Sequence, residues 1–120
     1  MISSYKDLTV WKKSMELVVM VYEFTALFPK TELYGLISQM RRCSVSIPSN
    51  ISEGSRRGSR KDFRQFLLVA YGSGAELETQ IEIVRRLPWG KDLNFIKVNA
   101  LLSEVMKMLN KFIASLQTTN

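Results

Sequence analysis

Histidine and cysteine, two side chains that many enzymes use for catalysis and metal binding, are nearly missing from this chain of 120 residues. It contains no histidine and a single cysteine, Cys43. Without histidine it has no Ser-His or Cys-His nucleophile pair and no Glu-x-x-His di-iron site, and an ordinary zinc site is not expected either. Three neighbouring carboxylates, Glu76, Glu78 and Glu82, are what remains for acid–base chemistry. We therefore expect no catalytic residues, no metal, no cofactor and no enzymatic activity.

Phosphate binding is the chemistry that the charges favour. The chain has 17 Lys and Arg against 11 Asp and Glu, a net charge of +6 with a pI near 9.7. Residues 41–64 hold seven basic and two acidic side chains, so most of the excess lies there. The candidates for sequence-independent contacts with RNA or DNA phosphates are Arg56, Arg57, Arg60, Lys61 and Arg64. The alternative is a solvated helix end whose charge only serves solubility.

The segment GSRRGSR, residues 54–60, contains two glycines and three arginines but is not a P-loop. It lacks the Gly-Lys-Ser/Thr ending and the preceding strand of that motif. We expect its glycines to punctuate helices, with Gly54 as the residue that follows the second helix. Ser59, with Asp62 three residues later, resembles a capping box that opens the third helix.

A second polar set recurs at three- and four-residue spacing, so its members would share one helix face. Together with a glutamate from further along the chain, it comprises Gln39, Arg42, Ser46, Asn50, Glu53 and Glu76. One interpretation is a ligand or nucleic-acid surface. We favour a structural polar contact between the second and third helices or between subunits, because the set mixes acids with bases.

The elements that carry these residues are four predicted helices, at about residues 8–27, 32–53, 60–86 and 93–116. The apolar period continues through Pro48, so the second helix should extend past it. Short connections between long helices predict an all-α, up-down-up-down four-helix bundle, as a single domain over residues 1–120. There is no apolar run of membrane-spanning length, and MISSYKDLTV is not typical of a signal peptide. With one cysteine, this predicts a cytoplasmic protein without membrane contact.

The first helix is apolar on every side over Leu17–Tyr22. A surface helix of a monomeric bundle shows one apolar stripe. We therefore expect Val19, Met20 and Val21 to contact another subunit of a homo-oligomer. The alternative is a helix with an unusually wide core-facing side.

Three stretches carry a family resemblance: LTVW at residues 8–11, QMRRCSVSIPSNISEG at 39–54 and AYGSGAELETQ at 70–80. They are similar to the bacterial four-helix bundle family of the 23S ribosomal RNA intervening-sequence protein, over roughly residues 5–115. The resemblance implies ring-like pentamers without established catalytic activity. In a related group a basic pentamer engages nucleic acid and a reverse transcriptase, so the resemblance implies RNA or DNA as a partner. Cys43 and Ser52 stand where alanine is usual in the family.

Overall fold

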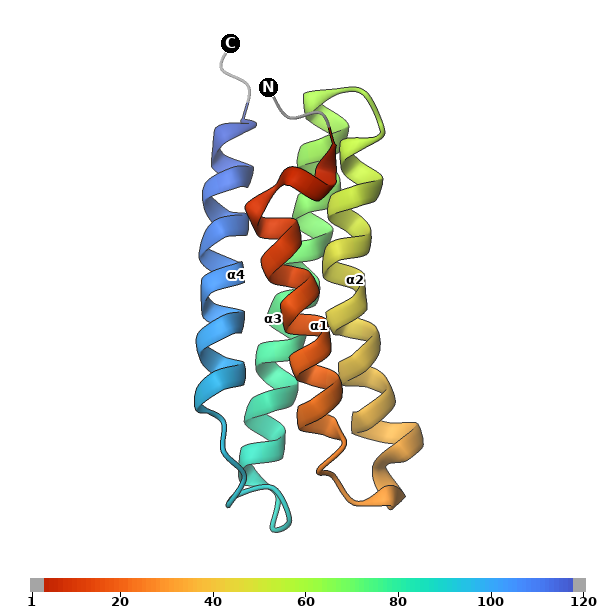
Figure 1. Ribbon diagram of the computed structural model, residues 1–120, viewed down its shortest axis with the longest axis vertical. Helices are drawn as coiled ribbons and strands as arrows, with labels where there is room; N and C mark the ends of the chain where they lie inside the picture. Colours follow the sequence, from red (N-terminus) through yellow and green to blue (C-terminus); the bar gives the residue numbers. More distant parts are fainter. Residues whose placement is uncertain (1–3, 118–120) are drawn as a thin grey trace.

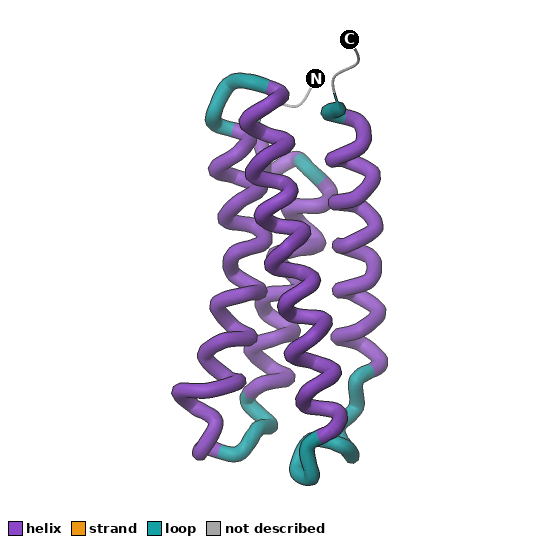
Figure 2. The backbone as a smooth tube through the Cα atoms, turned by 180° about the vertical axis from the view of Figure 1, so that it is seen from behind, coloured by secondary structure: helices purple, strands orange, loops and turns teal. Residues whose placement is uncertain are grey.

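The computed structural model describes residues 4–117, and every regular element within them is helical. The long helices are α1 (Thr9–Thr25), α2 (Ser38–Ser55), α3 (Arg60–Arg86) and α4 (Ile96–Ser115). Successive helices lie side by side and alternate in direction (Figure 1, Figure 2), in a body of 51 × 23 × 21 Å. This is the four-helix bundle that the sequence predicts. Residues 1–3 and 118–120 of the predicted domain lie outside the described residues.

The approach to α2 is more irregular than its apolar period suggests. A 3-10 turn at Lys30–Glu32 leads into a π-helical turn at Leu33–Ile37, and Gly35 inside it has non-helical dihedral angles. The Glu32 carboxylate accepts a hydrogen bond from the Leu36 backbone N at 3.4 Å, which satisfies one of the free N–H groups at this helix start. From Ser38 the helix is regular and continues through Pro48, as predicted.

The fourth helix begins at Ile96, three residues later than predicted. Asn94 Oδ1 accepts a hydrogen bond from the Ile96 backbone N at 3.0 Å, so the amide side chain stabilises the start of the helix. Phe95 is buried, with its ring 5.3 Å from that of Phe24 on α1. This aromatic contact fixes where the connecting loop returns to the bundle, which the local sequence around residue 93 does not reveal.

The second and third helices approach each other closely at Gly54. This glycine lies inside α2 and is buried, so the expectation that it follows the helix is wrong. A Cβ atom placed on it would lie 2.7 Å from Phe66 Cβ and 3.0 Å from Phe63 Cδ1. The residue is therefore small because α3 occupies the space beside it. The backbone role expected of it falls to Gly58, whose φ of +87° is in the left-handed region.

The core is apolar along the full length of the bundle. Fully buried side chains from all four helices include Leu17, Val21, Met40, Ile47, Ile51, Leu67, Leu77, Val105 and Leu109. Burying one such side chain stabilises a fold by about 1.5–3 kcal/mol. The buried hydroxyls of the core bond back to their own helices, as when Thr25 Oγ1 donates to the Val21 carbonyl at 2.8 Å. Among the described residues, the buried serine and threonine hydroxyls therefore all have a hydrogen-bond partner.

Candidate nucleic-acid interface

The connection between α2 and α3 presents the basic residues at one end of the bundle, the end that also holds the start of α1 and the end of α4 (Figure 1). Gly58 supplies the left-handed residue of the turn. Ser59 then caps α3, because its Oγ accepts a hydrogen bond from the Asp62 backbone N at 3.1 Å. The predicted capping role of Ser59 is confirmed, and α3 occupies the predicted range Arg60–Arg86.

Two arginines of the turn are exposed and rest on aromatic rings. The Arg56 guanidinium lies 5.5 Å from the centre of the Tyr5 ring, and that of Arg57 lies 4.9 Å from the centre of the Phe66 ring. Arg57 Nε also donates to Glu53 Oε2 at 3.1 Å, with both side chains about half exposed. An exposed ion pair of this kind contributes at most about 1 kcal/mol and is screened by salt. Both guanidinium groups can therefore bind an incoming anion while aromatic rings limit their freedom.

The other three basic candidates differ in how available they are. Arg60 Nη2 donates to the Ser115 carbonyl at 2.9 Å, so it satisfies one of the free carbonyls at the end of α4. Arg64 is half-buried, and its Nε is enclosed without a hydrogen-bond partner among residues 4–117. Lys61 is exposed in the first turn of α3. The residues best placed to contact phosphate are thus Arg56, Arg57 and Lys61.

Lys6 is a basic residue at this end that was not predicted from the sequence. Lys6 is exposed in the 3-10 turn at Tyr5–Asp7, next to the ring on which Arg56 rests. It lies 50 positions before Arg56 along the chain, so no local charge pattern links the two. Only the return of the amino-terminal segment to the end of α2 brings them together.

The polar set on α2 forms a hydrogen-bonded contact with α3, but through its small members. Ser46 Oγ and Ser73 Oγ lie 2.8 Å apart across the two helices. Asn50 Nδ2 donates to the Ser46 carbonyl at 2.8 Å and to Ser46 Oγ at 3.0 Å. This arrangement positions the serine hydroxyl for its partner on α3. The contact supports a structural role for Ser46 and Asn50.

The charged members of that polar set do not join each other as expected. Glu53 pairs with Arg57, and Glu76 Oε2 accepts from Cys43 Sγ at 3.4 Å. Gln39 and Arg42 make no hydrogen bond or ion pair among residues 4–117. Arg42 therefore makes no polar contact with Asn50, Glu53 or Glu76 within one chain, and the alternative of a contact between subunits stays a prediction.

Cys43 is packed as a small apolar residue rather than as a nucleophile. Burial raises the pKa of its thiol, and the hydrogen bond to Glu76 and the negative charge of that carboxylate raise it further. Gln80 Nε2 donates to the sulfur at 3.5 Å, an opposing effect. A thiol in these surroundings stays protonated near neutral pH and reacts slowly.

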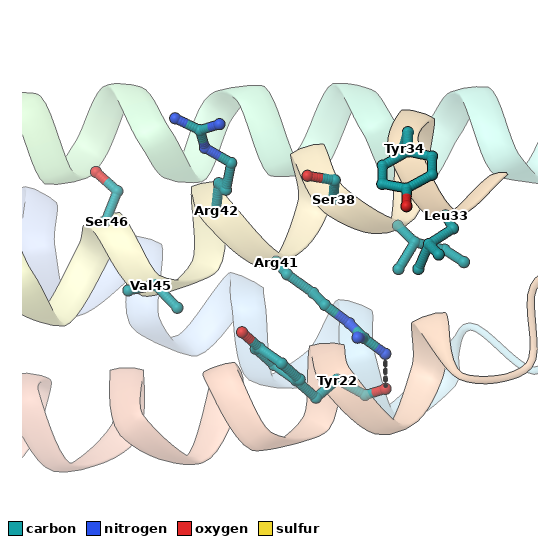
Figure 3. A pocket seen from close by; sticks show the side chains of 9 residues that line it. Tyr22, Leu33, Tyr34, Ser38, Arg41, Arg42, Val45 and Ser46 are labelled. Carbon is teal, nitrogen blue, oxygen red and sulfur yellow. Dashed lines mark hydrogen bonds between the residues drawn. The ribbon is translucent and has the colours of Figure 1, made fainter.

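A groove runs between α1 and α2 on the side of the bundle (Figure 3). Its volume is about 660 Å³, and its lining is Tyr22, Leu33, Tyr34, Ile37, Ser38, Arg41, Arg42, Val45 and Ser46. Arg41 crosses its floor: Nη2 donates to the Tyr22 carbonyl at 3.3 Å and Nε to Thr25 Oγ1 at 2.9 Å. In Figure 3 Arg42 points away from α1, on the opposite side of α2 from Arg41.

The three residues expected at a subunit contact lie in three different environments on α1. Val19 is 59% exposed, Met20 is half-buried, and Val21 is fully buried among its own chain's core residues. Val21 faces inward because it is two residues from Val19 on a helix, on the opposite side. It is not available to another subunit, and the expectation for this residue is corrected. The exposed apolar face consists instead of Val19 with Met15 and Tyr22.

The glutamates considered for acid–base chemistry do not meet in an enclosed site. Glu78 and Glu82 border one surface depression, but all six residues that line it belong to α3. Glu82 pairs with Arg85 at 3.6 Å and with Arg86 at 3.3 Å. Over residues 4–117, no three Cys, Asp or Glu side chains gather in a way that could hold a metal ion.

The comparison with protein families matches residues 6–111 to the model described as "23S rRNA-intervening sequence protein". The chain belongs to this family. The match covers the whole bundle except the last turn of α4, and it includes both the basic turn and the α2–α3 polar contact. A search of curated proteins finds no match for this family member. None of the helices in the described part of the chain is long and apolar enough to cross a bilayer.

Proposed function

We propose that this family member is a non-enzymatic, self-assembling bundle that binds the phosphates of RNA or DNA through the end of the bundle formed by the α2–α3 turn. The observation that carries the proposal is the exposed trio Arg56, Arg57 and Lys61, with two guanidinium groups resting on aromatic rings. Such side chains bind phosphate through charge and carry no base readout. The family name, which refers to an intervening sequence of 23S rRNA, makes RNA the first ligand to try.

Self-assembly is the second part of the proposal. Among residues 4–117, eleven large apolar side chains are exposed by more than a third of their surface, and several of them line the α1–α2 groove. Patches of this kind mark protein–protein contacts. The family resemblance suggests a ring-like pentamer. A scaffold that holds a protein partner without touching nucleic acid is the second candidate, and the same apolar groove favours it.

The test is binding of fluorescein-labelled single-stranded RNA and duplex DNA, followed by anisotropy between about 25 and 200 mM salt. Three phosphate contacts per subunit predict a slope of log K against log salt of about −2 to −3 for each subunit engaged. The triple variant Arg56→Ala, Arg57→Ala, Lys61→Ala should weaken binding about tenfold or more and flatten the slope.

A matched control removes three exposed basic residues from the opposite end of the bundle. Arg86→Ala, Lys91→Ala and Lys97→Ala give the same loss of net charge. If charge acts locally, this control binds nearly as well as the wild-type protein. Equal weakening by both triple variants would mean that only the overall charge of the protein matters, which contradicts a binding site at the α2–α3 turn. If neither nucleic acid binds at 25 mM salt, the phosphate-binding role is wrong and the scaffold role is the remaining candidate.

A further inference from the structure

A pocket of about 300 Å³ lies beside the basic turn, at the end of the bundle that is uppermost in Figure 1. It is formed where the amino-terminal 3-10 turn, the end of α2, the start of α3 and the end of α4 meet. The pocket is smaller and more enclosed than the α1–α2 groove. Its lining includes Ser4, Tyr5, Ser55, Arg56, Phe63 and Phe112.

Three aromatic side chains give the pocket its apolar walls. Tyr5, Phe63 and Phe112 are each half-buried, so part of each ring stays accessible. Edge contacts hold the rings in place: the ring centres of Phe63 and Phe112 lie 5.2 Å apart, and those of Tyr5 and Trp11 lie 5.4 Å apart. Pockets for small ligands usually measure about 300–1,000 Å³. This pocket therefore has room for one planar ring system but not for a base pair that is still stacked in a duplex.

The polar groups of the pocket offer a hydrogen-bond donor and an acceptor. Ser4 Oγ accepts a hydrogen bond from the Lys6 backbone N at 3.2 Å, which leaves its O–H to donate elsewhere. Ser55 Oγ donates to the Ser52 carbonyl at 3.0 Å, which leaves its oxygen to accept. The edge of an unpaired nucleobase presents groups of both kinds.

Arg56 adds a positive charge to the same pocket. Its guanidinium lies 5.5 Å from the centre of the Tyr5 ring, and its side chain is exposed and makes no ion pair with any of residues 4–117. Only a sugar separates the base of a nucleotide from its phosphate. A nucleotide whose phosphate contacts Arg56 can therefore place its base against the aromatic walls.

We propose that this pocket binds one unpaired base of single-stranded RNA or DNA, while Arg56 contacts the adjoining phosphate. The inference rests on the phosphate-binding part of the proposed function and adds the form of nucleic acid that the site takes. A base inside a duplex is paired and stacked, and it must leave the helix before it can enter such a pocket. Stacking on aromatic side chains contributes about five- to a hundredfold in affinity per base and accepts any base. Charge alone would favour the duplex, because its phosphates are more densely spaced.

The test compares two fluorescein-labelled single strands of about 12 nucleotides, one complete and one in which every nucleotide is abasic. Both strands carry the same phosphates, so phosphate contacts alone give equal affinities. We expect the complete strand to bind the wild-type protein at least about fivefold more tightly than the abasic strand, and more tightly than a duplex of the same length. Equal affinities for the complete and abasic strands, or tighter binding of the duplex, would overturn the base pocket and leave phosphate binding intact. No binding of any of the three would overturn both proposals.

A variant of one pocket wall locates the effect. Tyr5→Ala removes an aromatic ring but no charge, so it should weaken binding of the complete strand by about fivefold and leave binding of the abasic strand unchanged. Tyr34→Ala is the matched control, because it removes a tyrosine ring that is 93% exposed near the opposite end of the bundle. It should bind both strands like wild type. Equal weakening of both strands by Tyr5→Ala would mean that the ring only positions Arg56, which would overturn the base pocket. Circular dichroism checks that the variant folds, and the comparison of strands on the wild-type protein does not depend on it.

Discussion

Adding one methyl group at Gly54 should destabilise the bundle, although the same change usually strengthens a helix. In Gly54→Ala the new Cβ atom would lie 2.7 Å from Phe66 Cβ and 3.3 Å from the Phe63 carbonyl oxygen. Ordinary carbon contacts are about 3.5–4.0 Å. Because the first of these neighbours is a Cβ atom and the second a backbone atom, neither can rotate away, and α3 has to move back from α2.

The magnitude follows from two opposing effects. Alanine in place of glycine inside a helix gains about 1 kcal/mol. Overpacking of a rigid contact typically loses about 1–3 kcal/mol, and we expect the upper end here. The net loss in unfolding free energy is then about 2 kcal/mol, which lowers the urea midpoint by about 1 M for an m-value of about 2 kcal/mol/M.

A matched substitution in α3 isolates the packing effect. Gly72 is also inside a helix, but a Cβ atom on it meets nothing within 4 Å. Gly72→Ala should therefore raise the unfolding free energy by about 0.5–1 kcal/mol. Both variants are compared with their parent by urea unfolding at the same protein concentration, so that any contribution from self-association is the same for all three. A Gly54→Ala chain as stable as its parent would refute the close approach of α2 and α3.

Three further predictions concern the contacts around the candidate site. Double-mutant cycles of Ser46→Ala with Ser73→Ala should give a coupling energy of about 0.5–1.5 kcal/mol in urea unfolding, and a value near zero would mean that the two hydroxyls do not bond. Glu76→Gln should lower the raised pKa of Cys43 toward its ordinary value, so the pH–rate profile of iodoacetamide alkylation shifts to lower pH, whereas an unchanged profile would leave burial as the whole cause. Arg60→Ala should lower the unfolding free energy by about 1 kcal/mol or less through loss of its bond to the end of α4, which thermal unfolding can detect.

Local sequence signals predicted those elements whose boundaries are set by local interactions. The third helix begins at Arg60 because Ser59 caps it. This cap can be predicted from the local sequence, because both of its residues lie within four positions of each other. The fourth helix begins later than expected: Asn94 Oδ1 accepts a hydrogen bond from the Ile96 backbone N, and Phe95 packs against Phe24, a residue more than 70 positions away. Only the second of these boundaries required knowledge of the tertiary structure.

The candidate site also combines features that the local sequence predicts with features that depend on tertiary structure. Its position and charge follow from the run of basic residues, but the availability of each side chain depends on distant partners. Arg60 binds the end of α4, while Arg56 rests on a ring from the amino-terminal turn. Gly54 was expected to end α2, a common local role of glycine. It is needed instead because α3 packs closely against it. Spacing along one helix carries no information about these partners.

The basic turn lies at the very end of the bundle, and this position links the proposed self-assembly to salt concentration. If copies assemble side by side, as the proposed function has it, the ends of the helices stay free and the basic turns of all copies lie on one rim. Like charges on that rim would repel within a Debye length of about 10 Å at 0.1 M salt. A bound polyanion would relieve this repulsion, and by linkage the ring would hold the polyanion more tightly than separate subunits do. Nucleic acid would then act as the counter-ion of the assembly, with avidity growing with each subunit that the strand spans.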